Sequence, residues 1–301
     1  MSVRIGIDLG GTKTELVALN QHGEECYRTR VPTPADDYQA IIATVVRLVR
    51  EAEQALSTRA SVGIGTPGSP SPSTQLMRNA NTQCLNGQPL ARDLNQALER
   101  DVLIANDANC FALSEAVDGA AREASVVFGV ILGTGTGGGV VINRQPLTGR
   151  NAIAGEWGHN TLPWPKASEH PGPACFCGKH GCIETFVSGP AMARDHELHT
   201  GETLDARRIA ELAATGEARA MATLDRYLDR LARALASVIN ILDPHVIVLG
   251  GGVSRIDSLY SELPRRLPAY VFSDSFNTPI APALYGDASG VRGAAWLWPG
   301  S

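Results

Sequence analysis

This sequence has no long apolar run, no dense run of charges of one sign and no cysteine spacing typical of disulfides. No segment approaches the roughly 18 uninterrupted apolar residues of a membrane-spanning helix, and the N-terminus has no secretory-signal pattern. Lys and Arg number 26 against 31 Asp and Glu, so no concentrated basic surface for nucleic acid is expected. The six cysteines are unevenly spread, unlike a disulfide framework. These absences predict a cytoplasmic protein with reduced thiols that binds neither membranes nor nucleic acid.

Apolar and glycine-rich segments repeat in a fixed order along the chain. Residues 4–19 and 126–142 each consist of an apolar strand, a Gly/Thr-rich turn and a second apolar strand. Each is followed by an apolar segment that ends in glycines, at 61–68 and 245–252. Amphipathic helical patterns lie between these strands, and 301 residues are enough for two domains. A hairpin followed by alternating helix and strand, twice over, predicts two α/β domains of common design.

The same pattern sets the expected domain limits. The first domain is expected to span residues 1–115 and the second residues 116–288. The last segment, 289–301, is rich in small residues, which favours a helix that packs closely on a neighbouring element. We expect this helix to pack back on the first domain.

The first glycine turn contains residues that suit a phosphate. Asp8-Leu9-Gly10-Gly11-Thr12-Lys13-Thr14 joins two strands, and glycines allow the N–H groups of a turn to approach an anion. The threonine hydroxyls add donors, and Asp8 is suited to hold Mg²⁺ through water. The order Gly11-Thr12-Lys13 is not that of a P-loop. A plain tight hairpin turn is the alternative.

Two further glycine sets favour nucleotide binding over that alternative. Gly133-Thr134-Gly135-Thr136-Gly137-Gly138-Gly139 lies between apolar strands, where each glycine weakens a sheet by about 0.5–1 kcal/mol. Such costs at matching places in two domains predict that both turns face one cleft and hold one polyphosphate. Gly250-Gly251-Gly252 follows an apolar strand, and open α/β sheets bind ligands at the carboxyl ends of strands. A strand-to-helix turn is the alternative for this third set.

Asn106-Asp107-Ala108-Asn109 follows the apolar strand at 102–105. A carboxylate at the end of a strand is well placed to act as a general base for a hydroxyl. The alternative is a helix N-cap, a position that Asn and Asp often occupy.

Three of the six cysteines lie within eight residues, in Cys175-Phe176-Cys177-Gly178-Lys179-His180-Gly181-Cys182. The two glycines allow the chain to double back, so that the thiolates can converge on a zinc ion, which prefers four tetrahedral Cys and His ligands. His180, His159 and His170 are candidates for the fourth ligand. A disulfide is disfavoured in a reducing compartment and would leave one cysteine unpaired.

Together these motifs resemble the ROK family of sugar kinases and repressors. The resemblance is carried by Asp8-Leu9-Gly10-Gly11-Thr12, Asn106-Asp107-Ala108-Asn109, Leu132-Gly133-Thr134-Gly135, Gly155-Glu156-Trp157-Gly158-His159 and the Cys-x-Cys-Gly-x-x-Gly-Cys loop. It covers essentially the whole chain. It implies two ribonuclease-H-like domains of the actin–hexokinase type around a central cleft, with ATP and a hexose as substrates. It also implies Mg²⁺ with the ATP, a structural Zn²⁺ and a homodimer.

The resemblance further implies roles for individual residues. Asp107 would be the catalytic base, and zinc would anchor a loop that shapes the sugar pocket. The implied sugar-binding residues are Asn106, Asp107, Glu156, His159 and Glu184. The implied zinc ligands are His159, Cys175, Cys177 and Cys182. The implied ATP-binding residues are Gly6, Asp8, Gly10, Gly11, Thr12, Lys13, Gly133, Thr134, Gly135, Thr136, Gly137, Gly138, Gly250, Gly251 and Gly252.

Within the family, residues 30–34, 85–89, 159–164 and 290–298 resemble the bacterial fructokinases that also accept mannose. We therefore expect phosphorylation of D-fructose to fructose 6-phosphate, with a kinase for mannose, glucose or an N-acetylhexosamine as the alternative. A non-catalytic, sugar-sensing regulator is less favoured, because too few residues precede Asp8 for a helix-turn-helix domain. Pro264 and Pro268 fall where the family resemblance implies a smooth helix, and the sequence leaves open whether they break it.

Overall fold

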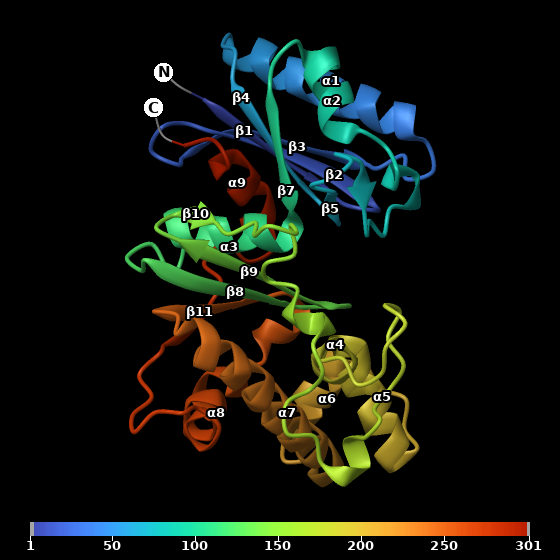
Figure 1. Ribbon diagram of the computed structural model, residues 1–301, viewed down its shortest axis with the longest axis vertical. Helices are drawn as coiled ribbons and strands as arrows, with labels where there is room; N and C mark the ends of the chain where they lie inside the picture. Colours follow the sequence, from blue (N-terminus) through green and yellow to red (C-terminus); the bar gives the residue numbers. More distant parts are fainter. Residues whose placement is uncertain (1–2, 300–301) are drawn as a thin grey trace. The chain divides into compact units, whose positions relative to one another are not determined.

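The structure is a computed structural model that describes residues 3–299 (Figure 1). Its internal contacts divide the chain into two compact units. The first contains residues 3–123, 139–154 and 287–299, and the second contains residues 124–138 and 155–286. Residues 139–154, which fall inside the range expected for the second domain, therefore group with the first unit. Within the described part of the chain, no helix is long and apolar enough to cross a membrane.

The first unit is built on a five-stranded sheet with the order β3-β2-β1-β4-β7. Strand β1 pairs antiparallel with β2 and parallel with β4, and β4 pairs parallel with β7. The strands are β1 (Arg4–Leu9), β2 (Lys13–Leu19), β3 (Glu25–Pro32), β4 (Ser61–Thr66) and β7 (Val102–Asn106). The other elements are α1 (Tyr38–Leu56), α2 (Leu90–Leu98), α3 (Asp107–Val117), α9 (Ser289–Trp296) and the ribbon of β5 (Ser69–Pro70) and β6 (Met77–Arg78).

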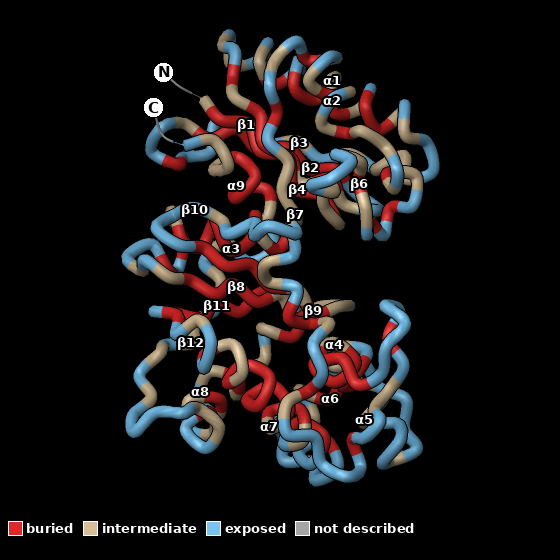
Figure 2. The backbone as a smooth tube through the Cα atoms, in the orientation of Figure 1, coloured by how far each residue is buried: buried red, intermediate tan, exposed pale blue. Residues whose placement is uncertain are grey.

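Side chains of β1 alternate between the two faces of this sheet. Ile5, Ile7 and Leu9 belong to a buried core that also includes the apolar faces of α1 and α2. The buried residues of α1 are Ile41, Ile42, Val45, Leu48, Val49 and Ala52, largely the face that their spacing predicts. Figure 2 shows this burial along β1 and on the inner side of α1.

Helix α9 covers the opposite face of β1 and β4 at very short range. A Cβ atom on Gly6 would lie 2.1 Å from a carbonyl oxygen of α9, and one on Gly63 would lie 1.9 Å from another. On the helix itself, a Cβ on Gly293 would lie 1.6 Å from the carbonyl oxygen of Cys110 in α3. Glycine at these positions is therefore what allows α9 to pack between the sheet and α3.

The second sheet repeats the plan of the first, with the order β10-β9-β8-β11-β12. Strand β8 pairs parallel with β11, β11 pairs parallel with β12, and β9 pairs antiparallel with β10. The strands are β8 (Val126–Leu132), β9 (Thr136–Ile142), β10 (Gln145–Pro146), β11 (Val246–Gly250) and β12 (Ile280–Pro282). The predicted duplication of an α/β design is confirmed at the level of topology.

The helices of the second unit gather around one long, mostly buried helix, α7. They are α4 (Glu184–Val187), α5 (Gly189–Thr200), α6 (Ala206–Ala214), α7 (Ala218–Leu242) and α8 (Ser258–Arg266). Leu224, Leu228, Leu231 and Leu235 of α7 are buried, as their spacing predicts. Pro264 lies inside α8 without ending it, whereas Pro268 falls in a short 3₁₀ turn, Leu267–Ala269. The regular helix therefore continues through Pro264 to Arg266, and the 3₁₀ turn that contains Pro268 follows it.

Candidate active site and metal cluster

Polar residues lie at the carboxyl edge of the first sheet, where its parallel strands end. Asp8 of β1 is in register with Gly65 of β4, and Thr66 of β4 is in register with Asn106 of β7. Asp107 follows directly as the first residue of α3. The hydroxyl of Thr66 is buried and has no hydrogen-bond partner among the residues that the structure describes. Asp8, Thr66, Asn106 and Asp107 thus share one sheet edge, the usual place for ligands in α/β sheets.

Asn106 and Asp107 have different local roles. The side chain of Asn106 caps α3, because its Oδ1 accepts a hydrogen bond from Ala108 N at 2.8 Å. Asp107 Oδ1 accepts from the same N–H at 2.8 Å. The helix-cap alternative is thus correct for Asn106, and it leaves the role of Asp107 as a base a prediction.

Asp8 lies in a strongly acidic environment. Burial, together with the negative charges of Asp107 and Glu15, raises the pKa of Asp8 to about 6, although Lys13 and Arg30 act in the opposite direction. An ionised carboxylate in such a place gains from a cation. The atoms available here to bind a cation are carboxylate oxygens, which Mg²⁺ prefers as ligands. The residues present therefore fit a magnesium ion held through Asp8.

The first glycine turn is a tight hairpin with an exposed tip. Gly10 N donates to Lys13 O at 3.0 Å, and Gly10 O accepts from the hydroxyl of Thr33 at 2.8 Å. Gly11, Thr12 and Lys13 are exposed. The hairpin geometry is as the plain alternative expects, and phosphate binding at its tip remains a prediction.

Two glycines in the implied ATP-binding set are closely packed against other residues. Gly6 is buried inside β1, and the place of its missing side chain is occupied by α9. A Cβ on Gly138 would lie 2.7 Å from the Trp157 ring. We therefore correct the assignment of Gly6: a residue enclosed by its own sheet and helix cannot contact ATP.

A cavity of about 1090 Å³ lies in the second unit, large enough for a nucleotide. Gly133 and Thr134 of the second turn border it, as does Gly252. Gly250 ends β11, and the side-chain position of Gly251 (φ 83°) is occupied by Leu132 O at 2.4 Å. Only Gly252 of the third set therefore borders the cavity.

The rest of the cavity wall was missed by sequence reasoning. It comes from α5, α6 and the turn before α8, and includes Ala193, Ala206, Arg207, Arg255, Ile256 and Ser258. These residues are spread over some 65 positions and share no motif. Some are small, some apolar and some charged. No signal in one sequence could have grouped them.

Glu184 is bound to the second glycine turn. Its Oε2 accepts a hydrogen bond from Thr136 N at 2.9 Å, and a Cβ on Gly135 would lie 2.6 Å from the same oxygen. The turn is also tied to α5, because Gly189 N donates to Gly133 O at 2.8 Å. One turn thus joins the predicted sugar-binding carboxylate to the nucleotide-sized cavity.

His159, Cys175, Cys177 and Cys182 converge, with ligand atoms all within 4.8 Å of one another. Cys175 Sγ lies 3.6 Å from His159 Nδ1, and Cys177 Sγ lies 3.6 Å from Cys182 Sγ. A tetrahedral zinc ion with bonds of about 2.3 Å places its ligands about 3.7 Å apart. The cluster therefore fits zinc, and it contains His159 instead of His170 or His180. Glu156, the remaining predicted sugar contact, is exposed directly before the turn Trp157–His159.

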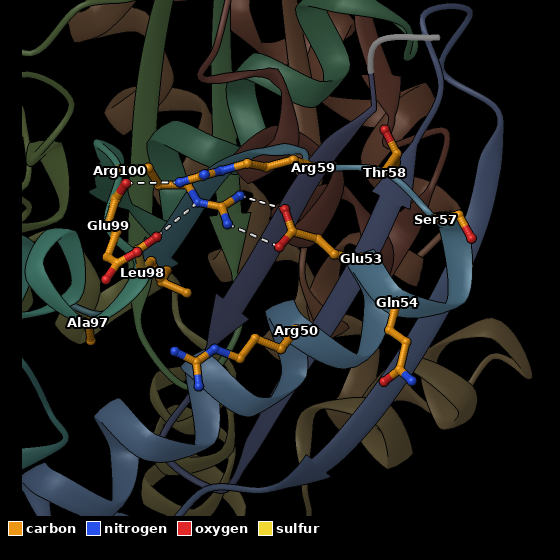
Figure 3. A pocket seen from close by; sticks show the side chains of 10 residues that line it. All are labelled: Arg50, Glu53, Gln54, Ser57, Thr58, Arg59, Ala97, Leu98, Glu99 and Arg100. Atoms are coloured by element: carbon orange, nitrogen blue, oxygen red, sulfur yellow. Dashed lines mark hydrogen bonds and ion pairs between the residues drawn. The ribbon is translucent and has the colours of Figure 1, made fainter.

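A smaller cavity of about 530 Å³ lies where α1 and α2 end (Figure 3). Arg100 pairs with both carboxylate oxygens of Glu53 at 2.5 and 3.0 Å, and Arg59 donates to Glu99 O at 2.9 Å. Arg100 neutralises the carboxylate of Glu53, and Arg59 donates to a carbonyl at the end of α2, as cations near helix C-termini do. The cavity is therefore accounted for by structural pairing.

Comparison with known proteins gives consistent matches over the whole chain. The model of the ROK family matches residues 4–301. The chain is 44% identical over 296 residues to an N-acetyl-D-glucosamine kinase of Pectobacterium atrosepticum, covering 97% of each chain. It is 42% identical over 296 residues to an N-acetyl-D-glucosamine kinase of Yersinia pseudotuberculosis, again covering 97% of each.

Solved structures agree with these matches. The chain is similar to a ROK hexokinase from Thermus thermophilus, with a TM-score of 0.87 and 30% identity over 98% of this chain and 97% of that one. It is also similar to a ROK family glucokinase from Streptomyces griseus in complex with glucose and AMPPNP, with a TM-score of 0.77 and 25% identity over 98% and 99% of the two chains. The predicted α/β fold of the actin–hexokinase type is confirmed.

The curated relatives do not support the expected likeness to fructokinases, because they are N-acetyl-D-glucosamine kinases. They do support the broader prediction of ATP-dependent hexose phosphorylation. The chain belongs to the ROK family and is a sugar kinase.

Proposed function

We propose that this protein is an ATP-dependent N-acetyl-D-glucosamine kinase. The observation that carries the proposal is the 42–44% identity to N-acetyl-D-glucosamine kinases across 97% of the chain. This replaces fructose as the preferred acceptor and corresponds to the N-acetylhexosamine alternative. The acetamido group has an N–H donor and a carbonyl acceptor, which glucose, mannose and fructose lack. A pocket that binds this group is therefore left with unpaired buried polar groups when one of those sugars binds instead.

Asp107 is the general base in this proposal. It would accept the proton of the attacking sugar hydroxyl. A general base must lie within hydrogen-bond reach of that proton, and a group at the end of a strand has access to the substrate. Phosphoryl transfer needs positioning and charge stabilisation more than covalent chemistry. The position of Asp107 at the first helical residue of α3 supports this role, since the helix fixes its backbone.

The nucleotide and its metal are assigned to two groups of residues. The cavity bordered by Gly133, Thr134 and Gly252 would hold the ATP. Mg²⁺, when bound, neutralises charge on the phosphates. Asp8 would hold that ion through water, and its raised pKa supports the need for a cation.

The four-residue metal cluster would hold a structural zinc ion. All four ligands come from the protein, which is typical of a structural site. The ion would fix the loop directly before Glu184. Its role in this proposal is to shape the side of the pocket formed by His159 and Glu184, without taking part in the transfer.

A coupled ATP-consumption assay over a panel of hexoses tests the proposal. N-acetyl-D-glucosamine should give the highest kcat/KM among N-acetylglucosamine, glucose, mannose and fructose. One buried polar group left unpaired costs about 1–3 kcal/mol, so we expect a preference of about ten- to a hundredfold. Asp107→Asn, purified in parallel, controls for contaminating kinases. A higher kcat/KM for fructose or glucose would refute the assigned substrate.

A further inference from the structure

Three charged side chains are buried together beside α7. Arg233 is 1% exposed, Glu169 6% and Arg230 9%. Burying charge is costly unless the charges are paired and hydrogen-bonded. Glu169 lies in the 3₁₀ turn Ala167–Glu169, 61 and 64 residues before its two arginine partners. We call Glu169, Arg230 and Arg233 the Arg–Glu cluster.

Arg233 holds the segment that runs from His159 toward Cys175. Its Nη1 donates to Pro163 O at 3.1 Å and to Trp164 O at 2.9 Å, and its Nη2 donates to Glu169 Oε1 at 2.9 Å. Only the planar fork of a guanidinium presents donors to acceptors in this arrangement. One side chain of α7 therefore fixes three points of a segment that is otherwise largely irregular.

Arg230 connects the same carboxylate to the neighbouring helices. Its Nε donates to Glu169 Oε1 at 2.8 Å and its Nη1 to Asp195 Oδ1 at 2.7 Å. Its guanidinium also lies 5.3 Å from the centre of the Phe186 ring of α4. Burial would raise the pKa of Glu169, but the hydrogen bonds from Arg233 and Arg230 lower it to about 2. Glu169 is therefore ionised over the working pH range.

The chain just before the segment held by Arg233 is hydrogen-bonded to the loop that contains Cys182. Two backbone hydrogen bonds join residues 160–162 to residues 181–183, one from Leu162 N to Gly181 O at 2.9 Å and one from Ile183 N to Asn160 O at 2.8 Å. The first of these segments follows His159 and the second contains Cys182. A shift of the segment held by Arg233 would therefore shift metal ligands as well.

Helix α4 is held by α7 near its C-terminal end. Arg230 lies over Phe186, and the hydroxyl of Tyr227 donates to Val187 O at 2.8 Å. Helix α4 begins at Glu184, whose carboxylate receives the hydrogen bond from Thr136. The orientation of Glu184 thus depends on contacts with α7.

We propose that the Arg–Glu cluster is a positioning device for the sugar-binding side chains His159 and Glu184, and that it anchors the metal loop from α7 independently of the metal. The inference rests on the proposed function, because it takes these two residues as sugar contacts. The zinc ligands fix the loop from within, and the cluster fixes the same loop from outside. None of the three cluster residues touches the substrate in this proposal.

Arg233→Lys tests the proposal, since it keeps the charge and loses the fork. The KM for the best hexose should rise by about ten- to a hundredfold, because small misplacements of binding groups have effects of this size. The KM for ATP should change less than about twofold, since none of the residues to which Arg233 donates, Pro163, Trp164 and Glu169, borders the cavity. Zinc content should stay at the wild-type level, and hydrogen exchange should become faster in peptides covering 160–169 and 181–187.

A double variant separates positioning from general stability. Glu169→Leu with Arg233→Met replaces one buried carboxylate and one buried guanidinium with apolar groups, which often restores stability, and Arg230 keeps its ion pair with Asp195. A positioning role predicts that the KM for the sugar stays raised even where the melting temperature recovers. Arg219→Lys is the matched control, because Arg219 lies on the same helix but pairs with the exposed Glu202 and the partly exposed Glu217. It should leave both KM values unchanged.

Several results would overturn the inference. An unchanged sugar KM with a lowered melting temperature would show a purely structural role, as would full recovery of the sugar KM in the double variant. An equal rise in both KM values would show a general disturbance. If the wild type phosphorylated no hexose, the proposed function would fail, and the exchange data would still decide whether the cluster holds the loop.

Discussion

Replacing Asp8 with Asn should make the ligand-free protein more stable and the enzyme less active. The pKa of Asp8 is raised from 3.8 to about 6 by burial, Asp107 and Glu15. The folded protein therefore keeps the Asp8 proton at pH values where the unfolded chain has lost it. The difference corresponds to about 3 kcal/mol of stability, which is lost as the pH rises from about 4 to about 6. Asp8→Asn avoids this loss of stability, so the variant should exceed the wild type in free energy of unfolding by most at pH values above about 6.

Urea unfolding of both proteins at about pH 4 and about pH 8 measures the effect. The free energies of unfolding should be similar at the lower pH, and the variant should be more stable by up to about 3 kcal/mol at the higher pH. Glu51→Gln, which removes a half-exposed carboxylate of α1 paired with Arg47, is the control and should show no such pH dependence. A variant less stable than the wild type at about pH 8 would refute the reasoning. Turnover should be strongly reduced in Asp8→Asn, because the proposed magnesium contact is lost.

Three further predictions follow from the site and the fold. Asp107→Asn should lower kcat by about 10²–10⁴-fold with sugar and ATP binding retained, as single-turnover and binding measurements can check; near-normal turnover would return Asp107 to a purely structural role. Elemental analysis should find about one zinc per chain, and Cys177→Ser should lose it and weaken sugar binding more than ATP binding; zinc-free protein purified without chelator would contradict the site. Gly293→Ala should lower the free energy of unfolding by more than about 3 kcal/mol, because its Cβ would lie 1.6 Å from Cys110 O; a thermal melt close to that of the wild type would contradict the packing of α9.

The strands and helices were largely predictable because their signals are local. Ile5, Ile7 and Leu9 alternate within six residues of β1, and that alternation alone assigns them to one face. The leucines of α7 recur at spacings of three and four, which defines a buried stripe. The succession of hairpin, helix and strand along the chain followed from repetition of the same local pattern, since each hairpin is followed by the same kind of helix and strand.

The role of Gly6 could not be predicted, because it depends on residues almost the whole chain away. A glycine near a Gly-rich turn has the appearance of a phosphate-binding residue. In the structure its missing side chain accommodates the backbone of α9. Residues 139–154 were assigned to the wrong side of the expected boundary for a similar reason: Gly139 makes room for α3, with Ala108 O only 2.5 Å from its Cβ position, and no local pattern records that contact.

The residue types alone could not predict which sugar is bound. Asn106, Asp107, Glu156, His159 and Glu184 are hydrogen-bonding groups that could serve any hexose, so their presence does not distinguish one sugar from another. The expectation of fructose depended on short stretches such as 85–89 and 159–164. Identity of 42–44% along 97% of the chain is the broader measure, and it favours N-acetyl-D-glucosamine.

The metal cluster and the Arg–Glu cluster show why one site could be predicted and the other could not. Three predicted zinc ligands, Cys175, Cys177 and Cys182, lie within eight residues, so their spacing itself carried the signal, and the resemblance to the ROK family selected His159 over His170 and His180 as the fourth. Arg230 and Arg233 stand in an amphipathic helix, where charged residues are normally expected on the solvent side. They are buried because Glu169 and two backbone carbonyls, more than 60 positions earlier, meet them there. Arg233 is a charge that a helix pattern would assign to solvent, and in the structure it is buried and donates three hydrogen bonds to residues 163–169, which supports the proposed role of the cluster in holding this loop.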